Sequence, residues 1–337
     1  MREEWMTPKR RVLSGMYQGR VDRIPVINPT SVVTVELQAE LDVHFPEAHT
    51  DARKMAALSA GGYEVYGFDS IMPYFSVHMG SAILGCEIDW GTPEDMPDAV
   101  THPYKSDEDI EVPTEEELLK VYTVRALVDA IKILREKYPH VAIIGKVMGP
   151  WTLGYNGFGV QDFLMQTILE PEMIKRSLDK LEEISIMFAN LQVKAGADVI
   201  CYPDHATGDL VSPEMYNEFL TERHKKITKL IGAPTILHIC GNTLKRSRWF
   251  AEEGFDAFHY DTKTDLVELK KVTGKNISLT GGISNVNSLL QGTPEQVKEE
   301  TKWAAKNGVD LLSPECAIPL LVPIKNLKAI VEAAKEI

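Results

Sequence analysis

Short apolar runs alternate with longer stretches of helical periodicity along most of the chain. Residues 141–147, for example, form a nearly continuous apolar run, which is typical of a parallel strand buried on both faces. Between such runs, apolar residues recur at helical spacing, as Val33, Leu37 and Leu41 do at intervals of four. The pattern therefore predicts a chain of repeated strand–helix units.

Eight of these apolar runs are predicted to be strands, and helical sequence follows each of them. They lie around Ile24, Asp69, Val141, Val199, Leu237, Phe258, Leu279 and Leu311. Eight such units in 337 residues predict an α/β fold of the (β/α)8 TIM-barrel type: one domain over 1–337, with a helical extension at about 1–20. A doubly wound open sheet is the alternative, but it usually has fewer strands, and no Gly-x-Gly-x-x-Gly pattern follows the first run.

Three stretches carry more specific expectations. Residues 75–101 have no clear helical period and contain several glycines and prolines, so an excursion with short hairpin strands is expected there. A capping-box pattern predicts one helix over about 114–138. Residues 149–159 are rich in glycine and are expected to form a loop that presents the aromatic side chains of Trp151 and Tyr155.

Composition limits the function classes. The formal net charge of −13 argues against a surface that binds nucleic acid. No apolar run reaches the roughly 18 residues that a transmembrane helix needs, and the first residues lack the apolar core of a signal peptide. The four cysteines stand far apart, unlike a disulfide framework. We therefore expect a cytoplasmic protein that binds neither nucleic acid nor membranes.

One apolar run ends in a histidine and a cysteine two positions apart, His238 and Cys240. Side chains at this spacing in a strand leave the same face, so the imidazole and the thiol point into one space, and Gly241 lets the chain turn directly afterwards. Cys316 lies in an equivalent place, after the apolar run at 309–312. One histidine and two cysteines are a ligand set of catalytic zinc sites that keep the fourth position open.

The alternative interpretation of these three residues is a buried histidine and two inert core thiols, because free cysteine is among the most buried residue types. In a (β/α)8 barrel, however, active sites lie at the carboxyl ends of the strands. His238, Cys240 and Cys316 all follow predicted strands and should meet at that rim, which favours a zinc site.

Several motifs in the second half of the chain resemble the uroporphyrinogen decarboxylase superfamily, and within it the corrinoid-dependent branch of methylcobamide:coenzyme M methyltransferases. They are His238-Ile239-Cys240-Gly241-Asn242-Thr243, Tyr202-Pro203-Asp204, Asp261-Thr262-Lys263-Thr264-Asp265-Leu266, Gly292-Thr293-Pro294-Glu295 and Ser313-Pro314-Glu315-Cys316-Ala317. The resemblance runs from about Ile24 to the last residue and implies a (β/α)8 barrel.

This resemblance implies an enzyme that moves a methyl group from a methylated corrinoid protein to a small thiol, above all coenzyme M, in methyl metabolism of the methanogenic type. Zn²⁺ would be held by His238, Cys240 and Cys316. Homocysteine and a pterin remain alternative acceptors. A metal-free lyase like uroporphyrinogen decarboxylase is a second possible function, and a non-catalytic protein that binds corrinoid or zinc is a third.

Two departures from the family pattern bear on these alternatives. The decarboxylases carry an arginine motif near the amino terminus, whereas residues 27–31 read Ile-Asn-Pro-Thr-Ser and contain no arginine. This absence argues against a porphyrinogen with four carboxylates, which needs fixed positive charge. Glu315 stands where a small residue is expected before Cys316, so we consider it as a fourth zinc ligand or as a neighbour of the metal.

Other candidate residues follow from the predicted rim and the resemblance. Asp204 and Asp261 come directly after strands and are expected to orient His238 or to fix substrate, although capping a loop is an equally good role for either. Trp151 and Tyr155 are expected to receive the flat face of the corrinoid, with packing over the barrel mouth as the alternative. Asn242, within the His-x-Cys motif, is expected to contact the cofactor as well.

Overall fold

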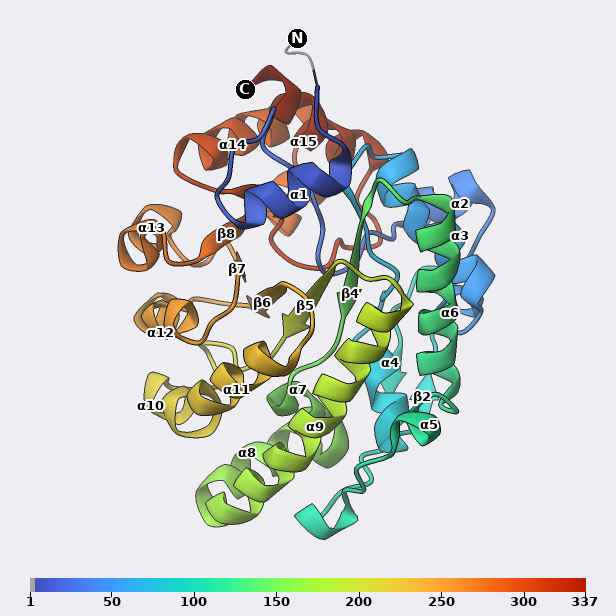
Figure 1. Ribbon diagram of the computed structural model, residues 1–337, viewed down its shortest axis with the longest axis vertical. Helices are drawn as coiled ribbons and strands as arrows, with labels where there is room; N and C mark the ends of the chain where they lie inside the picture. Colours follow the sequence, from blue (N-terminus) through green and yellow to red (C-terminus); the bar gives the residue numbers. More distant parts are fainter. Residues whose placement is uncertain (1–3) are drawn as a thin grey trace.

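The computed structural model describes residues 4–337, and its central feature is a curled sheet of parallel strands surrounded by helices (Figure 1). Neighbouring strands in the sheet follow the order β1-β4-β5-β6-β7-β8-β9. Their bounds are β1 (Ser70–Ile71), β4 (Ala142–Lys146), β5 (Val199–Pro203), β6 (Thr235–Ile239), β7 (Ala257–Tyr260), β8 (Ser278–Ile283) and β9 (Leu311–Pro314).

A single residue, Val26, closes the gap between the last and the first strand of this sheet. It forms a parallel bridge to Leu312 of β9, and its carbonyl accepts a 2.7 Å hydrogen bond from the N–H of Asp69, next to β1. The expected eight strand positions are therefore present, and they close into a (β/α)8 barrel. The first strand is only one bridge long because Pro25 and Pro29 flank it and have no N–H to donate to a ladder.

Helices follow the strands around the outside of the barrel (Figure 1). The α-helices are α1 (Pro8–Met16), α2 (Val35–Leu41), α3 (Ala52–Glu64), α4 (His78–Ser81), α5 (Glu115–Leu118), α6 (Tyr122–Lys137), α7 (Pro150–Phe158), α8 (Val160–Leu169), α9 (Pro171–Ala195), α10 (Pro213–Tyr216), α11 (Glu222–Leu230), α12 (Ser247–Glu252), α13 (Leu266–Thr273), α14 (Pro294–Lys306) and α15 (Ile324–Glu336).

Helix α1 lies against the amino-terminal ends of the strands. The N–H of Lys9 donates to the carbonyl of His140 just before β4, and the hydroxyl of Ser278 at the start of β8 donates to Met16. This end of the barrel is therefore covered. The carboxyl ends of the strands lie at the opposite end, where the candidate site residues follow them.

Three sequence expectations need correction. The loop predicted at 149–159 is wrong, because most of it is helix α7. Its glycines serve close packing rather than a turn: a Cβ at Gly154 would lie 2.3 Å from the ring of Phe163. The helix predicted over 114–138 is two helices, α5 and α6. In the 75–101 segment the hairpin β2 (Ile88–Asp89) and β3 (Asp98–Ala99) is confirmed, but the short helix α4 was not expected.

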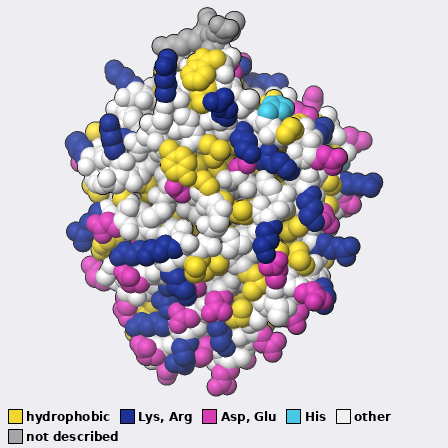
Figure 2. Space-filling model, viewed as in Figure 1, with side chains coloured by type: hydrophobic (Ala, Val, Ile, Leu, Met, Phe, Trp, Pro, Cys, Tyr) yellow, Lys and Arg dark blue, Asp and Glu magenta, His cyan; other side chains and the backbone are white. Residues whose placement is uncertain are grey.

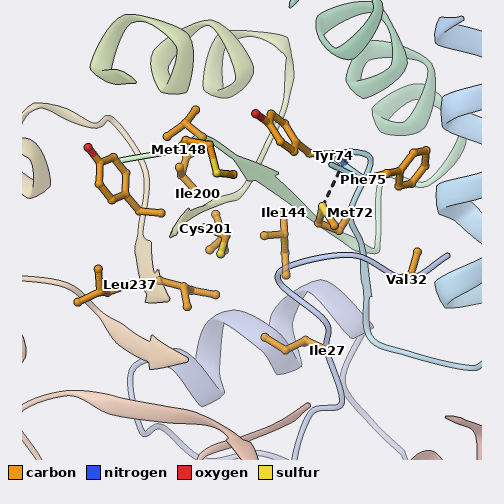
Figure 3. Packing of buried hydrophobic residues seen from close by; sticks show 14 of the residues in the cluster. Ile27, Val32, Met72, Tyr74, Phe75, Ile144, Met148, Ile200, Cys201 and Leu237 are labelled. Carbon is orange, nitrogen blue, oxygen red and sulfur yellow. Dashed lines mark hydrogen bonds between the residues drawn. The ribbon is translucent and has the colours of Figure 1, made fainter. Parts of the chain in front are cut away.

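The apolar core fills the barrel and the space between the sheet and the helices. Figure 3 shows one part of this core, which contains Ile27, Met72, Ile144 and Cys201. Each of these side chains is fully buried. On the viewed face of the surface, basic and acidic side chains are interspersed (Figure 2). None of the helices within residues 4–337 is long and apolar enough to cross a membrane.

A buried ion cluster ties the closing residue to the first strand. The carboxylate of Asp69 accepts hydrogen bonds from Arg11, from Arg23 and from the N–H of Val26. Arg11 also binds Asp22, with 2.6 Å between Nε and Oδ1. Although burial opposes ionisation, the hydrogen bonds from Arg11 and the N–H of Met6 keep the pKa of Asp22 well below its usual range. The cluster therefore helps to hold Val26 beside β1, where the first strand has few backbone hydrogen bonds of its own.

Candidate metal centre at the barrel mouth

Strand β6 delivers His238 and Cys240 to the carboxyl end of the barrel. All five residues of β6 are buried, and His238 is 0% exposed. Gly241 follows with a φ of +80°, a conformation that glycine adopts without strain, so the chain turns immediately after Cys240. Cys316 comes from the loop after β9, which lies three places from β6 in the sheet. The curvature of the barrel brings the two loops together.

The side chains of His238, Cys240 and Cys316 form one compact group. The Nε2 atom of His238 lies 3.2 Å from Sγ of Cys240 and 3.4 Å from Sγ of Cys316, and the two sulfurs are 3.6 Å apart. Ligand atoms around a tetrahedral zinc lie about 3.6 Å (N to S) and 3.8 Å (S to S) apart, given Zn–N near 2.0–2.1 Å and Zn–S near 2.3 Å. The donor set and its spacing therefore fit one zinc ion.

A hydrogen bond fixes which nitrogen of His238 faces the thiols. Nδ1 donates to the carbonyl oxygen of His259 at 3.1 Å, which leaves the lone pair on Nε2 directed at the cysteines. The ring of His259 lies 4.5 Å from that of His238, and its Nε2 donates to the carbonyl of Pro314, two residues before Cys316. Burial lowers the pKa of His259 to about 3, so its ring is neutral.

The two thiols influence each other strongly. The hydrogen bond with Cys240 and the proximity of His238 lower the pKa of Cys316 well below its ordinary value, against the effect of burial. The same hydrogen bond, together with burial, raises the pKa of Cys240. A divalent metal bound by both sulfurs would stabilise both of them as thiolates.

Asp261 binds the turn after Cys240 and forms no hydrogen bond with His238. Its Oδ2 accepts from the N–H of Gly241 at 2.8 Å, and its Oδ1 accepts from the N–H of Lys263. The hydroxyl of Thr264, from the same motif as Asp261, donates to the carbonyl of Gly241. Both residues hold the turn that follows Cys240. The expectation that Asp261 orients His238 is wrong, because the carbonyl of His259 does so.

Asp204 is fully buried, and its carboxylate binds residues other than His238 and the two cysteines. Its Oδ1 accepts from the N–H and hydroxyl of Thr152 in α7, and its Oδ2 contacts Nε2 of His224 in α11 at 3.1 Å. His224 also binds Glu253; although burial lowers its pKa, the two carboxylates raise it to about 9, so the imidazole is protonated. Asp204 thus anchors the loop after β5 and does not orient His238 as expected.

The three residues expected at the corrinoid lie in different surroundings. Trp151 is 0% exposed and packs edge-on against Phe163 with ring centroids 5.0 Å apart, and Tyr155 is buried beside it. Since both rings lie inside the protein, the structure gives no support to their receiving a corrinoid face. Asn242 is exposed at the rim, where it lines a pocket of about 460 Å³ with Ser212 and Arg246.

The carboxylate of Glu315 is bound by backbone and hydroxyl groups of neighbouring loops. Its Oε1 accepts from the N–H of Asn285 at 2.7 Å, and its Oε2 accepts from the N–H and the hydroxyl of Thr262. It therefore ties the loops after β7 and β8 to the loop that carries Cys316. In the described part of the chain, the side chains grouped closely enough to hold a metal ion are His238, Cys240 and Cys316, without Glu315. The structure does not support direct ligation by this carboxylate.

Replacing Glu315 with glutamine should therefore leave the zinc content unchanged and lower stability. The amide would place a donor opposite N–H donors, at a cost of about 1–3 kcal/mol in the free energy of unfolding. Urea denaturation and metal analysis of the purified variant would measure the two effects. The control is Glu332→Gln on α15, an exposed partner of Lys298. A changed zinc ligand shell in X-ray absorption would instead establish Glu315 as a ligand.

Two further polar residues lie near the metal donors: Lys146, which the sequence did not suggest, and His205, which the sequence left open between a place in the site and solvent. Lys146 ends β4 and is only 3% exposed. His205 follows Asp204, and burial lowers its pKa to about 4. The signal for Lys146 was present, because it is the one charged residue in the apolar run at 141–147. A lysine inside a buried strand needs a partner that sequence alone does not show.

A family model described as uroporphyrinogen decarboxylase (URO-D) matches residues 7–337. The chain belongs to this family. A methylcobamide:CoM methyltransferase, MtaA of Methanosarcina barkeri, is 37% identical over 335 residues, 98% of each chain. A methylated-thiol–coenzyme M methyltransferase of Methanosarcina mazei is 33% identical and covers 98% of this chain and 90% of its own. These relatives place the chain in the methyltransferase branch, which confirms the resemblance of its motifs.

A solved structure confirms the fold. A methyltransferase from Methanosarcina mazei superposes with a TM-score of 0.95 at 34% identity, covering 98% of this chain and 99% of its own. Both chains therefore share one fold over nearly their whole length.

Proposed function

We propose that this protein transfers a methyl group from a methylated corrinoid to coenzyme M, with a zinc ion held by His238, Cys240 and Cys316. The observation that carries the proposal is the group of one imidazole and two thiols, with donor atoms 3.2–3.6 Å apart, at the mouth of a barrel. The same chain is 37% identical to a methylcobamide:CoM methyltransferase. A methylated corrinoid protein would bring the methyl group.

The substrate thiol is mostly protonated at pH 7, and its thiolate is the reactive form. A zinc ion bound here would supply the positive charge that stabilises this thiolate. The sulfur then forms a bond to the methyl carbon while the cobalt–carbon bond breaks, and the bonding electrons leave with cobalt as Co(I). The thiol proton goes to solvent.

The residues of the chain contribute orientation. His259 holds the tautomer of His238 through its carbonyl, and Asp261 holds the turn after Cys240 through the N–H of Gly241. Glu315 links three loops of the rim. Because the metal donors come from β6 and from the loop after β9, these contacts keep the attacking sulfur in one place relative to the incoming methyl group.

The porphyrinogen decarboxylase alternative fits the site less well. The segment that would carry the arginines of that branch holds Asn28, whose amide side chain hydrogen-bonds Ser31 and Thr30 of the same segment. A four-carboxylate substrate would need cations there. A decarboxylase also makes no use of an imidazole and two thiols with metal-ligand spacing.

The proposal predicts that zinc-loaded protein methylates coenzyme M when free methylcobalamin is the donor. About one zinc per chain should be present, and spectra should show Co(I) formed together with methylated thiol. Homocysteine and a pterin are the control acceptors and should react far more slowly. Zinc-loaded protein that methylates none of the acceptors would contradict the proposal and favour a non-catalytic role.

A further inference from the structure

Lys146 is a buried cation with no anionic partner of its own. Its Nζ donates to the carbonyl oxygen of Thr30 at 2.7 Å and lies 4.7 Å above the ring of Tyr74. Both contacts favour an ammonium group, but neither neutralises its charge. Within residues 4–337 no carboxylate forms a hydrogen bond or an ion pair with Lys146, and the titratable groups that act on it are the thiols of Cys201 and Cys316. A buried charge in this state is costly unless something else offsets it.

The strand register places Lys146 on the inner face of the barrel near the metal donors. Lys146 of β4 pairs with Cys201 of β5, which pairs with Ile236 of β6. Ile236 and His238 share one face of β6, and two residues span about 6.6 Å along a strand. The Lys146 side chain therefore starts one layer below His238 on the same inner face of the barrel, and its charge acts on Cys316 and His205.

We propose, on the basis of the proposed function, that Lys146 determines thiol specificity by binding the sulfonate of coenzyme M. Coenzyme M has a thiol and a sulfonate joined by two carbons. If the thiol took the open fourth position of a zinc ion held by His238, Cys240 and Cys316, the two-carbon link would keep the sulfonate close to these residues. Lys146 is the buried cation in that region, and a sulfonate supplies the anion that its surroundings lack.

The charges support this assignment. Two thiolates and a neutral histidine would balance a zinc ion, so a bound thiolate and its sulfonate would bring two uncompensated negative charges. One ammonium offsets one of them. Burial lowers the pKa of Lys146 to about 8, yet at pH 7 most of it remains protonated. Thr30 lies in residues 27–31, the segment where the decarboxylases carry their arginine motif. In this chain its carbonyl binds the ammonium group of Lys146 instead.

The test compares thiols of equal length and different charge on the zinc-loaded protein. Isothermal titration would measure binding of coenzyme M (anionic), 2-mercaptoethanol (neutral) and 2-aminoethanethiol (cationic). The wild type should bind them in that order of affinity. Lys146→Met should lower the affinity for coenzyme M by roughly 10- to 100-fold, which corresponds to the loss of one charge-assisted contact. It should change the affinity for 2-mercaptoethanol by less than about threefold. Lys146→Arg keeps the charge and should restore part of the affinity.

Two results would overturn the assignment. An equal loss for coenzyme M and 2-mercaptoethanol in Lys146→Met would show that Lys146 acts on the metal or on the fold. A wild-type protein that binds coenzyme M no more tightly than 2-mercaptoethanol would also overturn the assignment, because the sulfonate would then add no affinity. This second result does not depend on whether the variants fold. Zinc content and circular dichroism accompany each titration. Because the readout is binding, it stays separate from the methyl-transfer assay, whose failure would count against the proposed function instead.

Discussion

Replacing Cys240 with alanine should remove zinc binding and methyl transfer together. The variant keeps one imidazole and one thiol, too few for a three-ligand site, and the remaining Cys316 loses the hydrogen bond that favours its thiolate. We expect zinc to fall from about one per chain to near zero after dialysis. Turnover should fall by more than about 100-fold, since losing a group that only orients a ligand already costs 10- to 100-fold.

The matched control is Cys86→Ala. Cys86 is also a free cysteine; it is buried, contacts the carbonyl of Asn156 and lies outside the group of His238, Cys240 and Cys316. It should retain zinc and turnover. Metal analysis, the methylcobalamin assay and circular dichroism on both variants would give the answer. Full zinc occupancy and normal turnover in Cys240→Ala would mean that the metal site has been assigned to the wrong residues.

The metal group could be predicted because its geometry follows from local rules. Strand periodicity places His238 and Cys240 on one face, and parallel strands in a barrel bring their carboxyl ends to one rim, where Cys316 also lies. Nothing else about the site was needed for that inference. The count of eight strands was predictable for the same reason, since buried parallel strands are apolar along their whole length.

The roles of the neighbouring polar residues could not be predicted in the same way. Asp204 and Asp261 were placed correctly after their strands, but the partner of each carboxylate depends on elements distant in the sequence. Asp204 binds Thr152 and His224, which lie 52 and 20 positions away. Lys146 reaches the carbonyl of Thr30 across 116 positions. The pattern of a strand predicts the position and the face of each residue, but it does not predict the hydrogen-bond partners of the side chain.

Glycine-rich helix α7 shows a related limit. Glycines at 154 and 157 indicated a loop, yet a Cβ at either would lie 2.3 Å from an aromatic ring, of Phe163 or of Tyr104. Tertiary packing selected glycine there, and it overrode the local preference for a turn. The buried positions of Trp151 and Tyr155 follow from the same packing.

Asp69→Ala should produce the largest loss of stability. Asp69 is 1% exposed, and its carboxylate accepts hydrogen bonds from Arg11, from Arg23 and from the N–H of Val26. Val26 is the residue that connects β9 to β1. Removing this carboxylate leaves Arg23 with Glu4 as its remaining carboxylate partner and takes away the side-chain support of the bridge. Breaking a buried ion pair by removing one partner costs about 3–5 kcal/mol in the free energy of unfolding, and urea denaturation followed by circular dichroism would measure it.

The location of the damage distinguishes barrel closure from general instability. The N–H groups of Val26 and Ile27 are bonded to Asp69 and to Leu312, so their hydrogen exchange should accelerate in the variant more than that of β6, on the other side of the sheet. Glu332→Ala, which removes an exposed ion pair with Lys298, is the control and should leave the denaturation midpoint and these amides unchanged. If Asp69→Ala unfolded like the control, the backbone bonds of Val26, Ile27 and Leu312 would be sufficient to close the barrel without the ion cluster.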